Sequence, residues 1–92
     1  MVPQGGRWSR DRSVSQSLVE ELEAVDWYNQ LVDACTDEEL KATLAHNRDE
    51  EKEHAAMLME WIRRRDRTFS KELKDYLFTD KPIATLEHQH KR

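Results

Sequence analysis

The chain has 92 residues, of which 37% are charged, and it contains only two glycines and two prolines. This length suits one small domain, and the composition favours long, charge-rich helices over a sheet protein with many turns. The formal charge of -4 argues against a nucleic-acid partner, which needs clustered Lys and Arg, and no apolar run reaches the roughly 20 residues that cross a bilayer. We therefore expect an all-α protein with no nucleic-acid or membrane partner.

The first half of the chain predicts one long helix after an irregular start. Residues 1–13 show no apolar periodicity and are predicted to form a flexible N-terminal segment. From Ser15 or Ser17 to about Cys35, apolar residues recur at spacings of three and four, which predicts an amphipathic helix. Its apolar stripe comprises Leu18, Leu22, Val25, Tyr28 or Asn29, and Val32. Cys35 is the single cysteine, which fits a reducing compartment, and we interpret it as a packing residue.

A second long helix is predicted from Asp37 to about Arg67, a length of roughly 45 Å at 1.5 Å per residue. Thr36 lies at a possible N-cap with Glu39 three residues later, which is the pattern of a capping box. Because the link between the two helices is short, we expect them to lie antiparallel.

The last part of the chain predicts one shorter helix. Residues 70–78 form an amphipathic stretch that we expect to cap one end of the bundle, and residues 79–82 end it at a proline. The following apolar cluster contains Ile83, Ala84 and Leu86. Residues 87–92 are polar and aperiodic, so we expect a flexible tail after a helical hairpin domain that covers residues 14–86.

Polar residues interrupt the seam of the second helix. Alternating steps of four and three define this seam as Leu40, Leu44, Asn47, Glu51, His54, Leu58, Trp61 and Arg65. Asn47, Glu51 and His54 hold its middle, where leucine is expected. A buried unpaired carboxylate costs several kcal/mol unless a partner compensates it. A metal ion would be such a partner.

Three candidate metal ligands follow from these patterns. Glu51 and His54 form a Glu-x-x-His pair on one helical face, and Glu21 belongs to the stripe of the first helix. Ferritin-like di-iron bundles use a Glu from each of two helices and a Glu-x-x-His from each of two others. This chain supplies half of that set, which a twofold axis would double to six ligands. The sequence therefore predicts half of a four-helix bundle, completed by dimerisation around a di-iron centre.

Four runs of the sequence resemble the encapsulated ferritins over about residues 18–85. They are Glu20–Tyr28, Asp33–Asp37, Leu44–Met57 and Tyr76–Phe78. The resemblance implies a ferroxidase that oxidises Fe2+ with O2 at a di-iron centre between two subunits, within a ring of five dimers. It also implies a cargo enzyme that feeds iron mineralisation inside a cytoplasmic encapsulin shell. Family members usually carry a C-terminal targeting peptide, and nothing after Pro82 resembles one.

The resemblance also assigns roles to individual residues. It implies that the ligands of the centre, where other divalent cations can replace iron, are Glu21, Glu51 and His54. Tyr28 corresponds to a residue beside the centre, where it either hydrogen-bonds a ligand or is only a packed ring. A secondary metal site on the approach to the centre is implied at Glu20, Glu23 and Trp27. These three share a helical face distinct from that of Glu21, and the alternative is an exposed acidic face that only solvates the helix.

Two other functions compete with the ferroxidase reading. The hairpin is alternatively a structural oligomerisation module, in which the seam polar groups set the register without metal. It is alternatively a metal buffer without turnover. His46 and Glu50 form either a surface metal site or a solvated pair, and His88 and His90 are candidates for adventitious metal binding.

Overall fold

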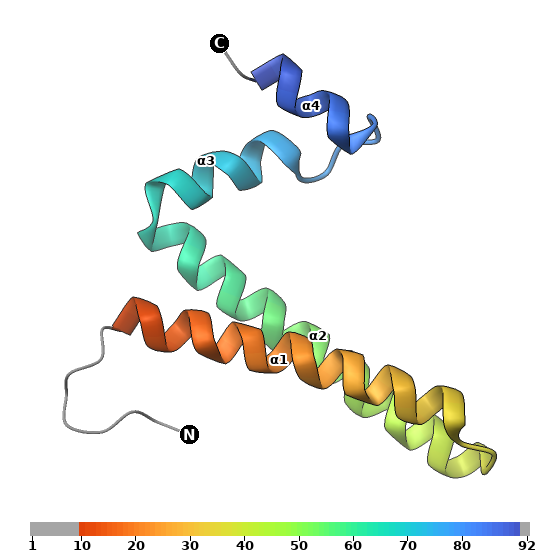
Figure 1. Ribbon diagram of the computed structural model, residues 1–92. Coiled ribbons are helices and arrows are strands. Elements are labelled where there is room, and N and C mark those ends of the chain that lie inside the picture. Colours follow the sequence, from red (N-terminus) through yellow and green to blue (C-terminus); the bar gives the residue numbers. More distant parts are fainter. Residues whose placement is uncertain (1–9, 91–92) are drawn as a thin grey trace.

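The computed structural model describes residues 10–90, and this part of the chain is helical with no strands. Its helices, labelled in Figure 1, are α1 (Arg10–Ala34), α2 (Glu38–Arg65), α3 (Arg67–Tyr76) and α4 (Ile83–His90). The prediction of an all-α fold with two long helices and a short C-terminal helix is confirmed. No helix of the described part is long and apolar enough to span a membrane.

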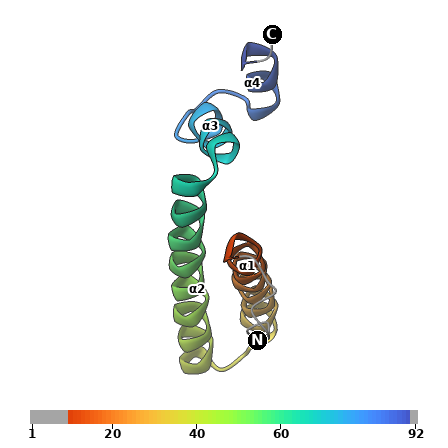
Figure 2. The same cartoon turned by 90° about the vertical axis from the view of Figure 1, so that its left-hand side faces the viewer.

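The two long helices form an antiparallel hairpin, joined by residues 35–37, and they lie side by side in both ribbon views (Figures 1 and 2). Asp37 is the N-cap of α2, since its side chain accepts a hydrogen bond from the Leu40 N–H at 3.0 Å. The prediction that Thr36 caps this helix was wrong by one residue. Both residue types can cap, and the link places the Asp37 carboxylate over the first turn.

The start of α1 lies earlier than the apolar periodicity indicated. The helix begins at Arg10, so residues 10–13 are helical although we expected them in the flexible segment. Apolar periodicity detects the packed face of a helix, and a polar first turn has no such signal. Residues 1–9 lie outside the described part of the chain.

A single aspartate joins α2 to α3. The Asp66 N–H donates to the Ile62 carbonyl, and the Asp66 carboxylate accepts from the Phe69 N–H, each at 2.9 Å. Asp66 is thus the C-cap of α2 and the N-cap of α3. As a result α2 ends two residues before its predicted end at Arg67, and α3 begins three residues before its predicted start. Arg63 of α2 also links the two helices, because its guanidinium donates a hydrogen bond to Oγ of Ser70 in α3 at 3.3 Å.

The last two helices extend away from the hairpin instead of capping it. Figure 2 shows α3 and α4 beyond the free end of α2, and α4 contacts α3. Residues 87–90, expected in a flexible tail, belong to α4. The carbonyl of Pro82 accepts from the Thr85 hydroxyl at 2.7 Å and from the Thr85 N–H at 3.2 Å, which helps to start this helix.

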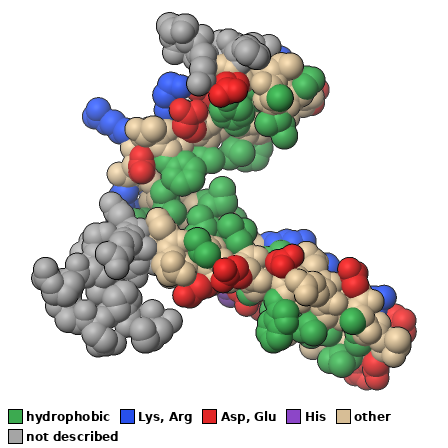
Figure 3. Space-filling model, viewed as in Figure 1, with side chains coloured by type: hydrophobic (Ala, Val, Ile, Leu, Met, Phe, Trp, Pro, Cys, Tyr) green, Lys and Arg blue, Asp and Glu red, His purple; other side chains and the backbone are tan. Residues whose placement is uncertain are grey.

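The described part of the chain buries little apolar surface. Its buried hydrophobic residues are Ala55, Ile62 and Leu86. The radius of gyration is 17.0 Å, whereas a compact domain of this length has about 12 Å. Large apolar side chains lie open in the corner between α2 and α3 and along the hairpin (Figure 3). Leu22, expected on the packed stripe of α1, is 52% exposed because it lies about 100° around the helix from Glu21, which faces α2.

The two neighbouring cap candidates give a direct test of the hairpin link. Asp37→Ala should lower the free energy of unfolding by about 1 kcal/mol, because it leaves the Leu40 N–H without its side-chain acceptor. Thr36→Ala should change it by less than about 0.5 kcal/mol. Urea unfolding followed by circular dichroism at one fixed protein concentration measures both. A larger loss in Thr36→Ala would contradict the observed cap.

Candidate metal centre

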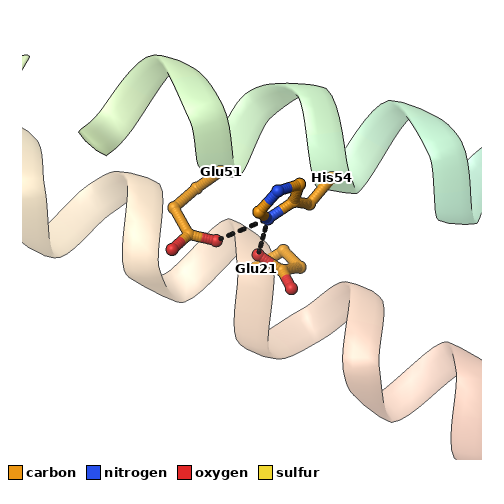
Figure 4. A group of neighbouring side chains, drawn as sticks. All are labelled: Glu21, Glu51 and His54. Atoms are coloured by element: carbon orange, nitrogen blue, oxygen red, sulfur yellow. Dashed lines mark ion pairs between the residues drawn. The ribbon is translucent and has the colours of Figure 1, made fainter. Parts of the chain in front are cut away.

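Three side chains converge between the long helices at the middle of the hairpin. Glu21 comes from α1, and Glu51 and His54 come from one turn of α2 (Figure 4). Nδ1 of His54 lies 3.5 Å from a carboxylate oxygen of Glu51 and 3.7 Å from one of Glu21. One ligand atom from each residue lies within 4.8 Å of the others. The three can therefore reach a single cation.

Helix geometry explains why these residues meet. Glu51 and His54 are three residues apart and therefore neighbours on one face of α2. The antiparallel arrangement brings Glu21 of α1 opposite them. The Glu21 and Glu51 side chains are each 26% exposed and His54 is 51% exposed. The group is thus half-buried in the seam and open to solvent on the flank where His54 lies.

The neighbouring Glu51 carboxylate disfavours the charged form of Glu21. The pKa of Glu21 is raised, first by a hydrogen bond shared with Glu51, then by burial and by the negative charge of Glu51. His54 acts in the opposite direction and offsets this only in part. A cation between the two carboxylates would offset this repulsion.

The chemistry of the donors fits a first-row divalent metal. Two carboxylate oxygens and one imidazole nitrogen form a set of mixed hardness that suits iron as well as zinc or manganese. Three ligands leave several coordination positions open. The residues present therefore fit half of a carboxylate-bridged di-metal site, and a second set of the same three would complete it.

The other sequence-predicted site residues lie apart from this group. Tyr28 is half-buried two turns along α1, and its ring centroid lies 6.1 Å from that of Trp27. Glu20 and Glu23 are exposed, and Trp27 is 60% exposed. Within the described residues, the secondary site at Glu20, Glu23 and Trp27 is an exposed face of α1, and its role stays a prediction.

The remaining histidines give no second cluster in the described part of the chain. The His46 ring nitrogen Nε2 lies 3.3 Å from a Glu50 carboxylate oxygen, and both side chains are exposed. This is the geometry expected of a solvated pair on a helix surface. His88 and His90 lie among residues whose side chains are not described.

Sequence reasoning missed one polar contact across the hairpin. Arg48 of α2 donates to the side-chain oxygen of Asn29 of α1, at 3.2 Å. The seam pattern had selected Asn47 rather than Arg48, and in a chain with 15 Lys and Arg residues nothing distinguishes this one. Only the relative placement of the two helices identifies the pair.

Comparisons with known proteins agree on one family. Residues 8–80 match the model of the family described as EncFtn-like. A crystal structure of a protein from Nitrosomonas europaea superimposes with a TM-score of 0.81 at 64% identity. The match covers 91% of this chain and 97% of that one.

Curated relatives show similar identities. "Encapsulated ferritin-like protein" of Rhodospirillum rubrum is 65% identical over 71 residues, which is 77% of this chain and 51% of that protein. "Ferritin-like protein" of Thermotoga maritima is 55% identical over 73 residues, 79% of this chain and 64% of the relative. "Encapsulin nanocompartment cargo protein EncC" of Myxococcus xanthus is 44% identical over 55 residues, 60% of this chain and 42% of the relative. The chain thus spans only about half the length of these relatives.

The crowded carboxylates predict an unusual effect of Glu21→Gln. Because the pKa of Glu21 is raised in the folded state, its protonated form stabilises the fold, and this contribution is lost as the pH rises through that pKa. A glutamine at this position stays neutral, so it does not lose this stability as the pH rises. Metal-free Glu21→Gln should therefore have a higher Tm than the wild type at pH 7, with the difference vanishing below about pH 4.

Thermal unfolding in the presence of a chelator measures this difference. Glu23→Gln, the same change at an exposed position of α1, should leave the Tm nearly unchanged. A lower Tm for Glu21→Gln at pH 7 would mean that the ionised carboxylate stabilises the metal-free hairpin.

Proposed function

The chain belongs to the EncFtn-like family, and from this premise we propose that it is a ferroxidase, which oxidises Fe2+ with O2 at a di-iron centre shared by two copies of the chain. The observation that carries the proposal is the convergence of Glu21, Glu51 and His54 within 4.8 Å in the middle of the hairpin. Two carboxylates beside an imidazole are costly in a helix seam unless a cation joins them.

A second copy completes both the ligand set and the fold. Doubling the three ligands about a twofold axis gives four carboxylates and two imidazoles, the set that a di-iron bundle uses. The open side of the group, where His54 is half-exposed, is where the second copy would bring its own ligands. The hairpin also leaves large apolar side chains exposed, among them Leu22 and Leu40, and two hairpins would make a four-helix bundle. Five such dimers would form the ring.

The residues of the chain prepare the site for iron. Glu21 and Glu51 would hold Fe2+ through oxygen and His54 through nitrogen, and the bound cation would offset the repulsion that raises the pKa of Glu21. Each bound Fe2+ would give one electron to O2, so that the iron would be oxidised to Fe3+ and the O2 would be reduced. The hard carboxylate oxygens favour the Fe3+ product.

The exposed acidic face of α1 would assist this reaction by collecting Fe2+ from solution. Glu20 and Glu23 lie one turn apart beside the exposed ring of Trp27. Their negative charge would raise the local concentration of Fe2+ near Glu21. Tyr28 would lie near the centre, two turns along α1 from Glu21 and half-buried on the packed side of that helix.

The names of two relatives support a place inside a shell. The Rhodospirillum rubrum relative is named an encapsulated ferritin-like protein, and the Myxococcus xanthus relative is named an encapsulin nanocompartment cargo protein. We extend the association to this chain and propose that it works as cargo of a cytoplasmic encapsulin compartment, where the Fe3+ is mineralised.

Aerobic oxidation of Fe2+ at neutral pH tests the ferroxidase. Glu51→Ala and His54→Ala should each lower O2 consumption to the rate of protein-free buffer, because each removes two of the six ligands of the shared centre. Glu50→Ala and His46→Ala are matched controls, since they remove the same residue types from an exposed face of α2, and they should keep the wild-type rate.

The same samples separate the competing functions. Native mass spectrometry should find an even number of chains in the active protein. Stoichiometric iron binding without O2 consumption would indicate a metal buffer. An oligomer that neither binds iron nor consumes O2 would indicate a structural module and would refute the ferroxidase proposal.

A further inference from the structure

Polar side-chain contacts of the described residues cross between α1 and α2 in two places. One is the contact of Glu21 with His54 and Glu51. The other is the hydrogen bond from Nη1 of Arg48 to the side-chain oxygen of Asn29, at 3.2 Å. Nε of the same guanidinium binds the Asp49 carboxylate at 3.1 Å, so the Arg48 side chain is held at two of its nitrogens. Only 23% of it is exposed.

The Arg48–Asn29 bond lies on the opposite flank of the hairpin from His54. At about 100° per residue, Arg48 lies about 60° around α2 from Glu51 in one direction, and His54 lies about 60° in the other. Asn29 lies about 80° around α1 from Glu21 and about 12 Å further along the helix. The contacts between the helices therefore lie on opposite flanks of the hairpin and at different positions along its axis. Together they restrain both the rotation and the sliding of one helix against the other.

Apolar packing alone restrains the hairpin weakly. Ala55 and Ile62 are the buried residues of α2, and the described part of α1 has none. A roll of α1 that lifts Glu21 away from His54 must stretch the Arg48–Asn29 bond on the opposite flank. A slide of one helix along the other stretches it as well.

We propose that Arg48 and Asn29 are positioning residues, which set the roll and register of α1 against α2 and so hold Glu21 within reach of Glu51 and His54. The proposal rests on the proposed metal centre and adds residues that hold no metal themselves. The planar guanidinium can bind Asp49 on its own helix and Asn29 on the other at the same time, which a lysine ammonium on a flexible stem does with less directional control.

The test compares Arg48→Ala with Lys52→Ala in the full chain. Both substitutions remove one positive charge near the site and a contact with Asp49, but only the first removes a contact with α1. Two readouts are needed. The visible spectrum of bound Co2+ reports the geometry of the ligands, and steady-state Fe2+ oxidation gives kcat and KM separately.

Arg48→Ala should lower kcat roughly tenfold, because small misplacements of reacting groups have large effects on rate, and it should alter the Co2+ spectrum while KM and the native mass stay unchanged. Lys52→Ala should match the wild type in both readouts. Asn29→Ala should behave like Arg48→Ala, and the double variant should lose no more than either alone. Asn29→Asp keeps an acceptor for Arg48 and should retain the wild-type kcat.

A lower Tm for Arg48→Ala with an unchanged kcat and Co2+ spectrum would overturn the proposal, since the bond would then only stabilise the hairpin. The ferroxidase proposal fails separately, if the wild type binds Co2+ but does not oxidise Fe2+. In that case the spectral difference between Arg48→Ala and Lys52→Ala alone supports or overturns the positioning role.

Discussion

The contact between Glu21 and Glu51 is the interaction on which the rest of the structure depends. Two carboxylates meet in the seam of a helical hairpin, where apolar side chains would pack at lower cost, and the pKa of Glu21 rises as a result. His54 relieves this only in part, because its ring is half-exposed at the edge of the seam. The pair of carboxylates therefore lowers the stability of the hairpin locally, and a bound cation would offset this cost.

Regular helix geometry made much of the fold and of the ligand group predictable. A capping pattern at residues 36–39 and the absence of Pro or Gly from the second helix were enough to predict an antiparallel pair, and the structure has it. Glu51 and His54 share a face by their spacing alone, and the stripe around Leu18 and Val25 directs Glu21 toward them. The family resemblance, carried by runs such as Leu44–Met57, was confirmed by the match over residues 8–80.

The features that could not be predicted depend on small energy differences or on contacts distant in sequence. Thr36 and Asp37 are both good caps, and their difference is a fraction of a kcal/mol. No Gly or Pro indicates the bend at Asp66 in the sequence. The short helix after Pro82 has no clear periodicity of apolar residues. The Arg48–Asn29 bond joins residues 19 positions apart, and it depends on how far each helix is rotated about its own axis.

Because the hairpin packs over a small apolar interface and would supply only half of a di-metal ligand set, metal binding and dimerisation would be coupled. If both copies of the chain contribute ligands, a metal bound at the shared site favours the dimer over the monomer, and by linkage the dimer binds the metal more tightly by the same factor. A monomer with a large buried core would gain little from this coupling, because its fold would already be stable. Here the described chain buries three hydrophobic residues, so packing between copies and metal binding would supply stabilisation that the single hairpin lacks. Assembly and metal affinity would then vary together, because both depend on the same placement of Glu21 opposite Glu51 and His54 in each copy.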